Sequence, residues 1–236
     1  MIIDIIQTVL SGGDVVPLIL MLLLMVPLLL ISLSVHEAAH GWMAHKCGDD
    51  TAYISGRVSL NPLAHLDPIG FLMLITVGFG WAKPVPVNYR YLRNPKRDIA
   101  LVSLAGPVSN IILCFLCTGV YVAAERFLGG TVVGMVLHLA FMISATLNAG
   151  LAVFNLIPLP PLDGSKVLSC LLPPNTAAKY LMLERYFRYI MLALIFASYV
   201  PVLGRIADII WTPISLVRQL LTGGFYSLFS FIFGLF

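Results

Sequence analysis

Charged side chains are scarce in this sequence. Of its 236 residues, 11% are charged and 59% are hydrophobic, whereas a soluble domain typically carries about 25% charged residues. Such a chain has too few polar side chains to cover a water-facing surface, which excludes an ordinary soluble enzyme. Intrinsic disorder is also excluded, because disordered chains combine low hydrophobicity with high charge. The composition predicts a polytopic membrane protein that forms one integral membrane domain over residues 1–236.

Basic residues and cysteines are also few. The 14 lysines and arginines are spread along the chain and form no basic face, so no nucleic-acid partner is expected. The four cysteines give no disulfide framework. Cys114 and Cys117 lie three residues apart in an apolar run. Packing as small buried hydrophobes is the favoured interpretation of this pair, with a metal or redox pair as the alternative.

Long apolar runs mark the expected membrane segments. A spanning helix needs about 20 apolar residues, and runs of this kind cover 15–46, 99–124 and 131–157. A fourth, shorter run covers 189–203. The tail 206–236 is apolar but broken by Pro213, Arg218 and Gly223-Gly224, so we expect another span, a hairpin or an interfacial helix there. The fold class expected is an all-α bundle of about four to six transmembrane helices.

Two segments after the first run differ from the rest. Residues 47–68 are polar, with β-prone residues around Gly56, and predict a small membrane-associated β-ribbon. Residues 69–81 are apolar but too short to span comfortably, and they predict a re-entrant or edge segment. Irregular backbone at membrane depth is tolerated only where protein or water satisfies its hydrogen bonds.

The distribution of basic residues predicts the orientation of the chain. Seven lysines and arginines lie in 45–98 and four in 159–188, whereas 1–14 holds none. With three spans in series, the two rich segments fall on the same side, and cytoplasmic loops are the ones enriched in Lys and Arg. We therefore expect the N-terminus outside and both basic segments in the cytosol.

The residues His36-Glu37-Ala38-Ala39-His40 form an H-E-x-x-H motif. On a helix, residues four apart share one face, so both imidazoles can bind one metal ion, for which zinc is the usual choice. Glu37 is then placed to act as general base toward the attacking water. Because ionisable groups inside an apolar run are costly, they are functional candidates by default. The alternative is a pair of interfacial histidines with a snorkelling glutamate.

A third metal ligand must come from elsewhere in the chain. His45 follows His40 by five residues and points about 140° away on a helix. Asp163 is the better candidate, because it follows a stretch in which Pro158, Pro160 and Pro161 break any helix. An unwound segment could return the Asp163 carboxylate to the bundle. Asp163-Gly164 is also a common turn pair, so a cytosolic turn stays open as the alternative.

Three motifs occur in order on three successive runs: His36-Glu37-x-x-His40, Gly106-Pro107-x-x-Asn110, and Asn155-x-x-Pro158-x-Pro160-x-x-Asp163-Gly164. Together they resemble the site-2 protease family (peptidase family M50), which consists of intramembrane zinc metalloproteases. Residues 83–98 and 125–130 are too few for a PDZ insertion, so the chain resembles the compact members without that domain. Residues 15–170 would be the catalytic core, and 171–236 the C-terminal helices.

The resemblance implies a role for each motif. His36, His40 and Asp163 would bind one catalytic zinc ion, Glu37 would be the general base, and Asn155 would stabilise the reacting carbonyl or its oxyanion. The Gly106–Asn110 motif would pack near the site, mainly through small residues between helices.

The implied function is hydrolysis of peptide bonds in or near transmembrane segments of membrane proteins, as in regulated intramembrane proteolysis. Its partners would be a membrane-protein substrate and the lipid bilayer, in the cell membrane of a bacterium or archaeon. The main alternative is a zinc-binding membrane protein without protease activity, such as a carrier or an inactive scaffold. A zinc hydrolase with a non-peptide substrate is a second alternative.

Two further segments are candidates for the surroundings of the site. His65 and Asp67 could form a second polar cluster near it, and the alternative is the edge of a ribbon with a turn. The segment 80–88 could line substrate entry, where its unpaired backbone would add a strand to an extended peptide.

Overall fold

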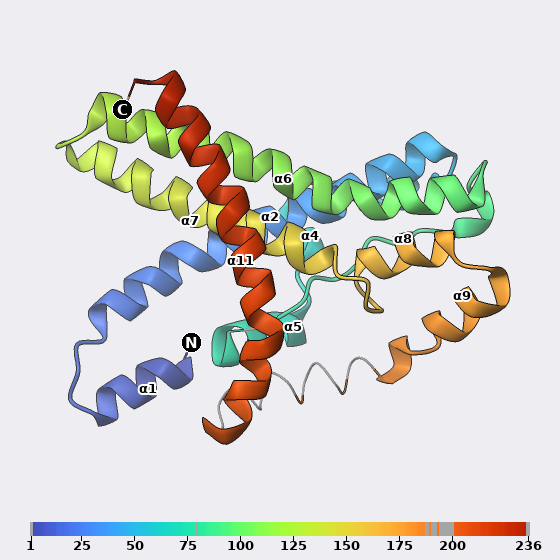
Figure 1. Cartoon of the computed structure of the whole chain (residues 1–236), viewed down its shortest axis with the longest axis horizontal. Helices are drawn as coiled ribbons and strands as arrows, with labels where there is room; N and C mark the ends of the chain where they lie inside the picture. Colours follow the sequence, from blue (N-terminus) through green and yellow to red (C-terminus); the bar gives the residue numbers. More distant parts are fainter. Residues whose placement is uncertain (1, 79, 187–188, 190–192, 194–200, 235–236) are drawn as a thin grey trace.

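The computed structural model describes the chain except for residues 1, 79, 187–188, 190–192, 194–200 and 235–236. The described residues are mainly helical (Figure 1). The helices are α1 (Ile2–Leu10), α2 (Val16–Cys47), α3 (Thr51–Ile54), α4 (Pro62–His65), α5 (Pro68–Val77), the 3₁₀-helix η1 (Tyr89–Tyr91), α6 (Pro95–Leu128), α7 (Val132–Asn155), α8 (Asp163–Leu171), α9 (Pro174–Leu181) and α11 (Pro201–Ile232).

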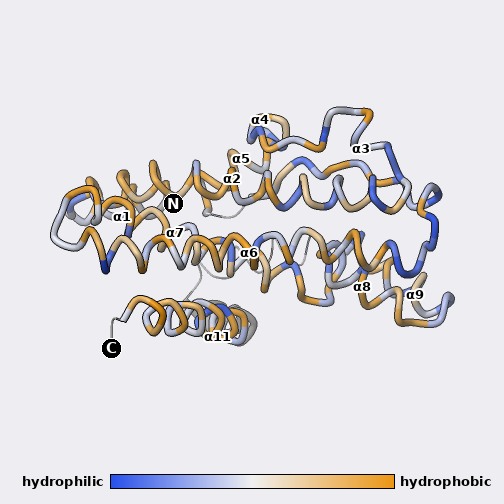
Figure 2. Tube along the Cα trace, turned by 90° about the horizontal axis from the view of Figure 1, so that it is seen from above, coloured by the Kyte–Doolittle hydropathy of each residue, from blue (hydrophilic) through white to orange (hydrophobic). Residues whose placement is uncertain are grey.

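Helices α2, α6 and α7 are long and apolar enough to cross a membrane. They have 32, 34 and 24 residues and correspond to the first three predicted runs. Helix α6 packs against both α2 and α7, and Figure 2 shows their apolar tubes lying side by side. The all-α class and these three spans are thus as expected. Most of the predicted fourth run, 189–203, lies outside the described residues.

The predicted β-ribbon at 47–68 is wrong. Within the described residues this segment holds the short helices α3 and α4, and its only ladder contact is one antiparallel bridge between Leu66 and Ala82. Capping side chains explain the difference. The Asn61 carboxamide oxygen accepts a hydrogen bond from Leu63 N–H (3.1 Å), and the Asp67 carboxylate accepts one from Gly70 N–H (2.8 Å). Each cap precedes a proline at the first helical position, which favours helical turns over strands.

The apolar segment 69–81 forms a short helix followed by a returning stretch of chain. Helix α5 has 10 residues, a length of roughly 15 Å at 1.5 Å per residue, so it is too short to span. The chain then turns back along it. A Cβ added to Gly70 would collide with the carbonyl oxygen of Trp81, so glycine permits this close return.

The C-terminal tail is a single helix. Helix α11 continues through Pro213, so the hairpin interpretation is wrong. It packs against α6 and α7 and lies across them in Figure 1. Aromatic rings join α11 to α6, with the ring centres of Phe115 and Phe225 5.2 Å apart. Cys114 and Cys117 are buried in the same apolar cluster, so their predicted packing role is confirmed.

The two basic segments meet at one end of the molecule. The end of α2, the start of α6 and the pair α8–α9 lie at the right of Figure 1, opposite the connection between α6 and α7. This arrangement agrees with the expectation that both segments share one side of the membrane.

Candidate active site

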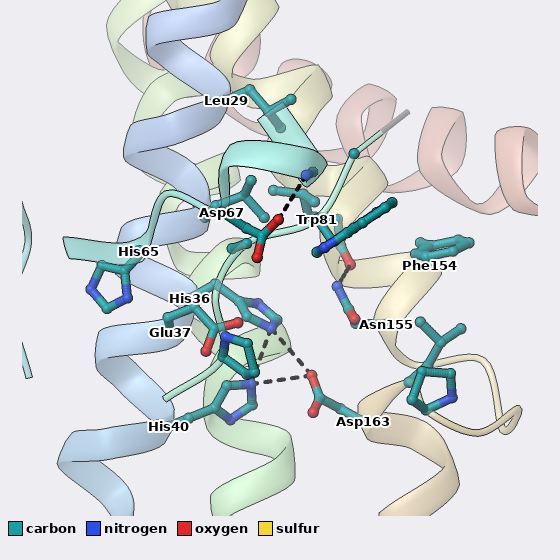
Figure 3. A pocket seen from close by; sticks show the side chains of 18 of the residues that line it. Leu29, His36, Glu37, His40, His65, Asp67, Trp81, Phe154, Asn155 and Asp163 are labelled. Carbon is teal, nitrogen blue, oxygen red and sulfur yellow. Dashed lines mark hydrogen bonds and ion pairs between the residues drawn. The ribbon is translucent and has the colours of Figure 1, made fainter. Parts of the chain in front are cut away.

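The three predicted metal ligands come together in the fold. His36 and His40 lie on one face of α2, and Asp163 is the first residue of α8. All three side chains are buried. Each histidine Nε2 lies 3.2 Å from the Asp163 Oδ2, and the two Nε2 atoms lie 3.0 Å apart (Figure 3). Ligand atoms distant in sequence therefore converge on one point.

The connection between α7 and α8 brings Asp163 to this point. Helix α7 ends at Asn155, and residues 156–162, which include the three prolines, form turns rather than helix. A Cβ added to Gly164 would collide with the carbonyl oxygen of Leu156. The Asp163-Gly164 pair thus allows the start of α8 to lie directly against the end of α7, and the segment returns to the bundle.

The second nitrogen of each histidine fixes which nitrogen faces Asp163. His40 Nδ1 lies 2.7 Å from the Val102 carbonyl oxygen, and His36 Nδ1 lies 2.5 Å from Asn110 Oδ1. Both partners are oxygens that can only accept, so each Nδ1 carries the hydrogen. Both Nε2 atoms then present lone pairs, and their 3.0 Å separation is a contact between two lone pairs rather than a hydrogen bond.

This donor set fits a zinc ion. Two lone pairs and a carboxylate oxygen facing one another are unfavourable unless a cation lies between them. Tetrahedral zinc with ligands at about 2.0 to 2.1 Å separates its ligand atoms by roughly 3.3 Å, close to the 3.0 and 3.2 Å found here. No other group of three or more His, Cys, Asp or Glu in the described residues has its ligand atoms so close together.

Glu37 lies beside the two histidines and contacts the segment that returns from α5. Its Oε2 accepts a hydrogen bond from the Val85 N–H at 2.9 Å. Val85 itself is buried. The carboxylate is therefore held on one oxygen by the protein backbone, and the structure records no hydrogen bond from the described residues to the other oxygen.

A cavity of about 1190 Å³ adjoins this cluster. Its walls come from α2, α5, α7, α8 and α11, and they include Glu37, Asn155 and Asp163 (Figure 3). Small-molecule pockets usually measure about 300 to 1,000 Å³, so this cavity is larger than most of them. It has room for an extended chain segment next to the three ligands.

Comparison with known proteins gives the family. The "Putative zinc metalloprotease YwhC" of Bacillus subtilis (strain 168) is 40% identical over 213 residues, which cover 87% of this chain and 90% of that protein. The chain belongs to peptidase family M50, the site-2 protease family. The family model matches residues 127–198 of this M50 peptidase, a stretch that holds Asn155 and Asp163. Membership makes the chain an intramembrane zinc metalloprotease, as the three motifs implied.

More distant relatives carry names of the same kind. The "Putative zinc metalloprotease Rip2" of Mycobacterium tuberculosis (strain ATCC 25618 / H37Rv) is 31% identical over 175 residues, 72% of this chain and 64% of that protein. The "Putative zinc metalloprotease MJ0611" of Methanocaldococcus jannaschii is 28% identical over 137 residues, 56% of this chain and 62% of that protein. No solved structure matches the M50 peptidase.

Part of the backbone of the 80–88 segment forms hydrogen bonds within the protein. Pro84 and Pro86 have no N–H to offer. Arg57 donates to the carbonyl oxygens of Lys83 and Pro84. Three N–H groups are donated within the chain, namely Lys83 to the His65 carbonyl, Val85 to Glu37 and Asn88 to Asp49. The strand template predicted for the M50 peptidase is therefore only partly free to pair with a substrate.

The remaining predicted residues line the cavity without touching the three ligands. Asn155 Nδ2 donates to the Leu151 carbonyl at 3.0 Å. The His65 Nε2 donates to the Ser59 carbonyl at 2.8 Å, and Asp67 caps α5. Asp67 thus lies at a helix start rather than at the turn of a ribbon, and both His65 and Asp67 line the cavity of the M50 peptidase.

Sequence reasoning missed Lys166. Its Nζ lies 3.6 Å from Asp163 Oδ1, the carboxylate oxygen that does not face the histidines. Burial alone would lower the pKa of Lys166, but the nearby Tyr89, Asp163 and Glu37 outweigh it and raise the pKa above its ordinary value. The sequence signal was the three-residue spacing from Asp163, which puts both side chains on one face of a helix.

The role of the Gly106–Asn110 motif was only half predicted. A Cβ on Gly106 would lie 2.6 Å from His36 Nε2 and would also collide with His40 Nε2. Glycine therefore lets α6 approach the two imidazoles, which is packing as expected. Asn110, however, bonds directly to His36, a contact that reading the motif as helix packing did not foresee.

Proposed function

We propose that the M50 peptidase cleaves peptide bonds in or near transmembrane segments with one zinc ion held by His36, His40 and Asp163. The observation that carries this proposal is the triangle of two Nε2 atoms and one Oδ2 atom, 3.0 to 3.2 Å apart. When bound, the zinc ion would supply Lewis-acid polarisation of the scissile carbonyl and of water. Proton transfer and binding of the oxyanion are assigned to the surrounding residues.

Glu37 acts as the general base in this proposal. Val85 N–H holds one of its oxygens, so the other accepts the proton of the attacking water and later passes it to the leaving amine. Asn155 lies in the cavity wall and gives one amide hydrogen to the Leu151 carbonyl. Its second amide hydrogen is the donor we assign to the oxyanion.

The substrate has to be extended at the cleavage point. A transmembrane helix hides its carbonyl groups in hydrogen bonds between residues four apart, and the attacked carbonyl must be released from them. The large cavity next to the ligands supports binding of an unwound stretch. Backbone pairing with the 80–88 segment would use the groups that no hydrogen bond within the described part of the protein occupies, such as the N–H of Val87, rather than the carbonyl oxygens bound by Arg57.

The same proposal includes the orientation of the chain. The ligand-bearing half of α2 lies toward the end of the molecule that carries both basic segments. With those segments in the cytosol, the N-terminus lies outside, and water reaches the ligands from the cytosolic side.

The decisive experiment compares the purified protein with its Glu37→Gln variant. We expect the variant to bind zinc as the wild type does and to lose about 10²- to 10⁴-fold in turnover of a transmembrane model substrate, because the proton acceptor is gone. Metal content and cleavage are measured on the same samples in detergent or proteoliposomes.

A His36→Ala variant serves as the control for the metal site, and it should lose both zinc and cleavage. Retained cleavage in the Glu37→Gln variant would remove Glu37 from the base role. Zinc bound without cleavage by either protein would favour the inactive-scaffold alternative.

A further inference from the structure

A chain of buried polar side chains connects α2, α6 and α7 behind the proposed metal site. Ser32 on α2, Asn110 on α6 and Asn148 on α7 are each at most 1% exposed. Asn148 belongs to none of the three sequence motifs and does not contact the metal ligands. Asn148 nevertheless contacts Asn110, and Asn110 in turn contacts His36 Nδ1.

The orientation of the Asn148 carboxamide is fixed by its surroundings. Its Nδ2 donates to the Ser144 carbonyl at 2.8 Å and to Ser32 Oγ at 2.9 Å. A carbonyl oxygen can only accept, so the nitrogen must be on this side. The Asn148 Oδ1 therefore points the other way, where it accepts a hydrogen bond from Asn110 Nδ2 at 2.8 Å.

The orientation of Asn110 is set mainly by Asn148, at 2.8 Å, with a longer contact of 3.4 Å from Asn110 Nδ2 to the Ser32 carbonyl oxygen. A carboxamide can rotate by half a turn and exchange its oxygen and nitrogen. In a rotated Asn110, two oxygens would face each other across the Asn110–Asn148 contact, leaving buried acceptors unpaired at a cost. Asn110 is thus held with its Oδ1 toward His36 Nδ1, at 2.5 Å.

His40 and His36 differ in how their tautomers are set. His40 Nδ1 faces a backbone carbonyl, that of Val102, which can never become a donor. His36 Nδ1 faces a side-chain amide, which could become a donor if it rotated. In that case the His36 hydrogen would move to Nε2, the atom that faces Asp163 and His40.

We propose that Asn148 is a positioning residue that, through Asn110, fixes the His36 tautomer with its Nε2 lone pair toward the metal site. This inference rests on the proposed function, because it assumes that His36 is a zinc ligand. Partners that hold the second nitrogen of a metal-binding histidine typically change metal affinity by about 10- to 100-fold when they are lost. Asn148 acts one residue further away, by locking such a partner.

The test measures zinc affinity on the full-length purified protein by competition with a chromogenic chelator. Asn148→Leu and Asn110→Leu should each weaken zinc binding by about 10- to 100-fold. The double variant should bind no more weakly than Asn110→Leu alone, because both changes remove the same restraint on His36. Asn148→Ala, which adds no bulk, is measured alongside in case the leucine is not accommodated.

A second readout needs neither zinc nor activity. In the metal-free protein labelled with ¹⁵N-histidine, the wild-type His36 Nδ1 should give the signal of a nitrogen that carries a hydrogen. In the Asn148 variants this Nδ1 signal should shift, because the Asn110 oxygen no longer fixes the hydrogen there. Cys117→Ala is the matched control, since Cys117 is also buried between α6 and α7 but bonds to Ser144 rather than to Asn110. It should leave both readouts unchanged.

Three outcomes distinguish the proposed role of Asn148 from the proposed ligand set. Zinc affinity within about twofold of wild type in both Asn148 variants, with unchanged His36 signals, overturns the role of Asn148. A double variant whose loss is the product of the single losses also overturns it, because Asn148 would then act independently of Asn110. Wild-type zinc affinity in His36→Ala would instead overturn the proposed ligand set itself.

Discussion

At the scale of single residues, the site depends on buried hydrogen-bond partners that orient the side chains around it. Two histidine Nδ1 atoms face oxygens that can only accept, and one carboxylate is shared between two imidazoles and a lysine. The motifs and the family resemblance predicted the three residues that the fold brings together, His36, His40 and Asp163. Lys166 was missed although its spacing from Asp163 was a signal, and Asn148 could not be predicted, because its contacts come from neighbours that only the fold supplies.

Lys166 is expected to hold the Asp163 carboxylate in its orientation. Its ammonium lies next to Oδ1, which leaves Oδ2 for the metal. Lys166→Met should therefore weaken zinc binding and lower kcat/KM by about tenfold, in the range that partners of metal ligands contribute. Lys166→Arg, which keeps the charge, should recover most of both losses. A methionine variant with wild-type zinc affinity, measured by chelator competition, would contradict this role.

Gly106 is expected to tolerate no side chain. A Cβ there would lie 2.6 Å from His36 Nε2, so Gly106→Ala should displace the imidazoles and abolish stoichiometric zinc binding. Gly224→Ala on α11 is the control, because a Cβ there meets nothing within 4 Å and alanine favours a helix by about 1 kcal/mol. Metal analysis and thermal unfolding of both variants check this. Full zinc occupancy in Gly106→Ala would show that α6 can move away.

At the scale of elements, the long helices were predictable and the short ones were not. Continuous apolar runs of about 20 residues match the length of a spanning helix, and α2, α6 and α7 follow them. Between α2 and α6, the β-prone residues suggested strands. Local caps at Asn61 and Asp67 instead start α4 and α5, which shows that a cap followed by proline outweighs a weak strand pattern.

The segment between α5 and η1 is expected to act on Glu37. Val85→Pro removes the N–H that holds the Glu37 carboxylate and should lower kcat by about tenfold or more while zinc stays bound. The comparison is Val87→Pro, since the structure records no hydrogen bond from the Val87 N–H. If both variants instead lower kcat/KM equally, and mainly by raising KM, the segment pairs with the substrate backbone. Steady-state kinetics on a transmembrane substrate separate the two cases.

At the scale of the whole molecule, the distribution of charge agrees with the distribution of elements. The two segments rich in Lys and Arg were predicted on one side from composition alone, and the fold places them at one end. The placement of α11 across α6 and α7 could not be predicted, because its pattern contains breakers that this helix nevertheless accommodates.

Reporter fusions test the orientation. A fusion after residue 94, just before α6, should report the cytosol, and one within the Gly129-Gly130 connection should report the outside. A pair of reporters that are active only in opposite compartments makes the two sites each other's control. The reverse pattern would mean that water and substrate reach the ligands from the other side.

The convergence of α2 and α8 on one point affects the stability of the fold around α8. Between the end of α2 and the start of α8 the chain runs through α3 to α7, so a metal ion shared by His36, His40 and Asp163 would act as a cross-link over a long loop. Metal bound only by the folded state adds stability that grows with its free concentration, and closing a long loop restricts the unfolded chain most. Chelation should therefore first loosen the 156–171 region, seen as faster proteolysis there while the three long helices stay intact.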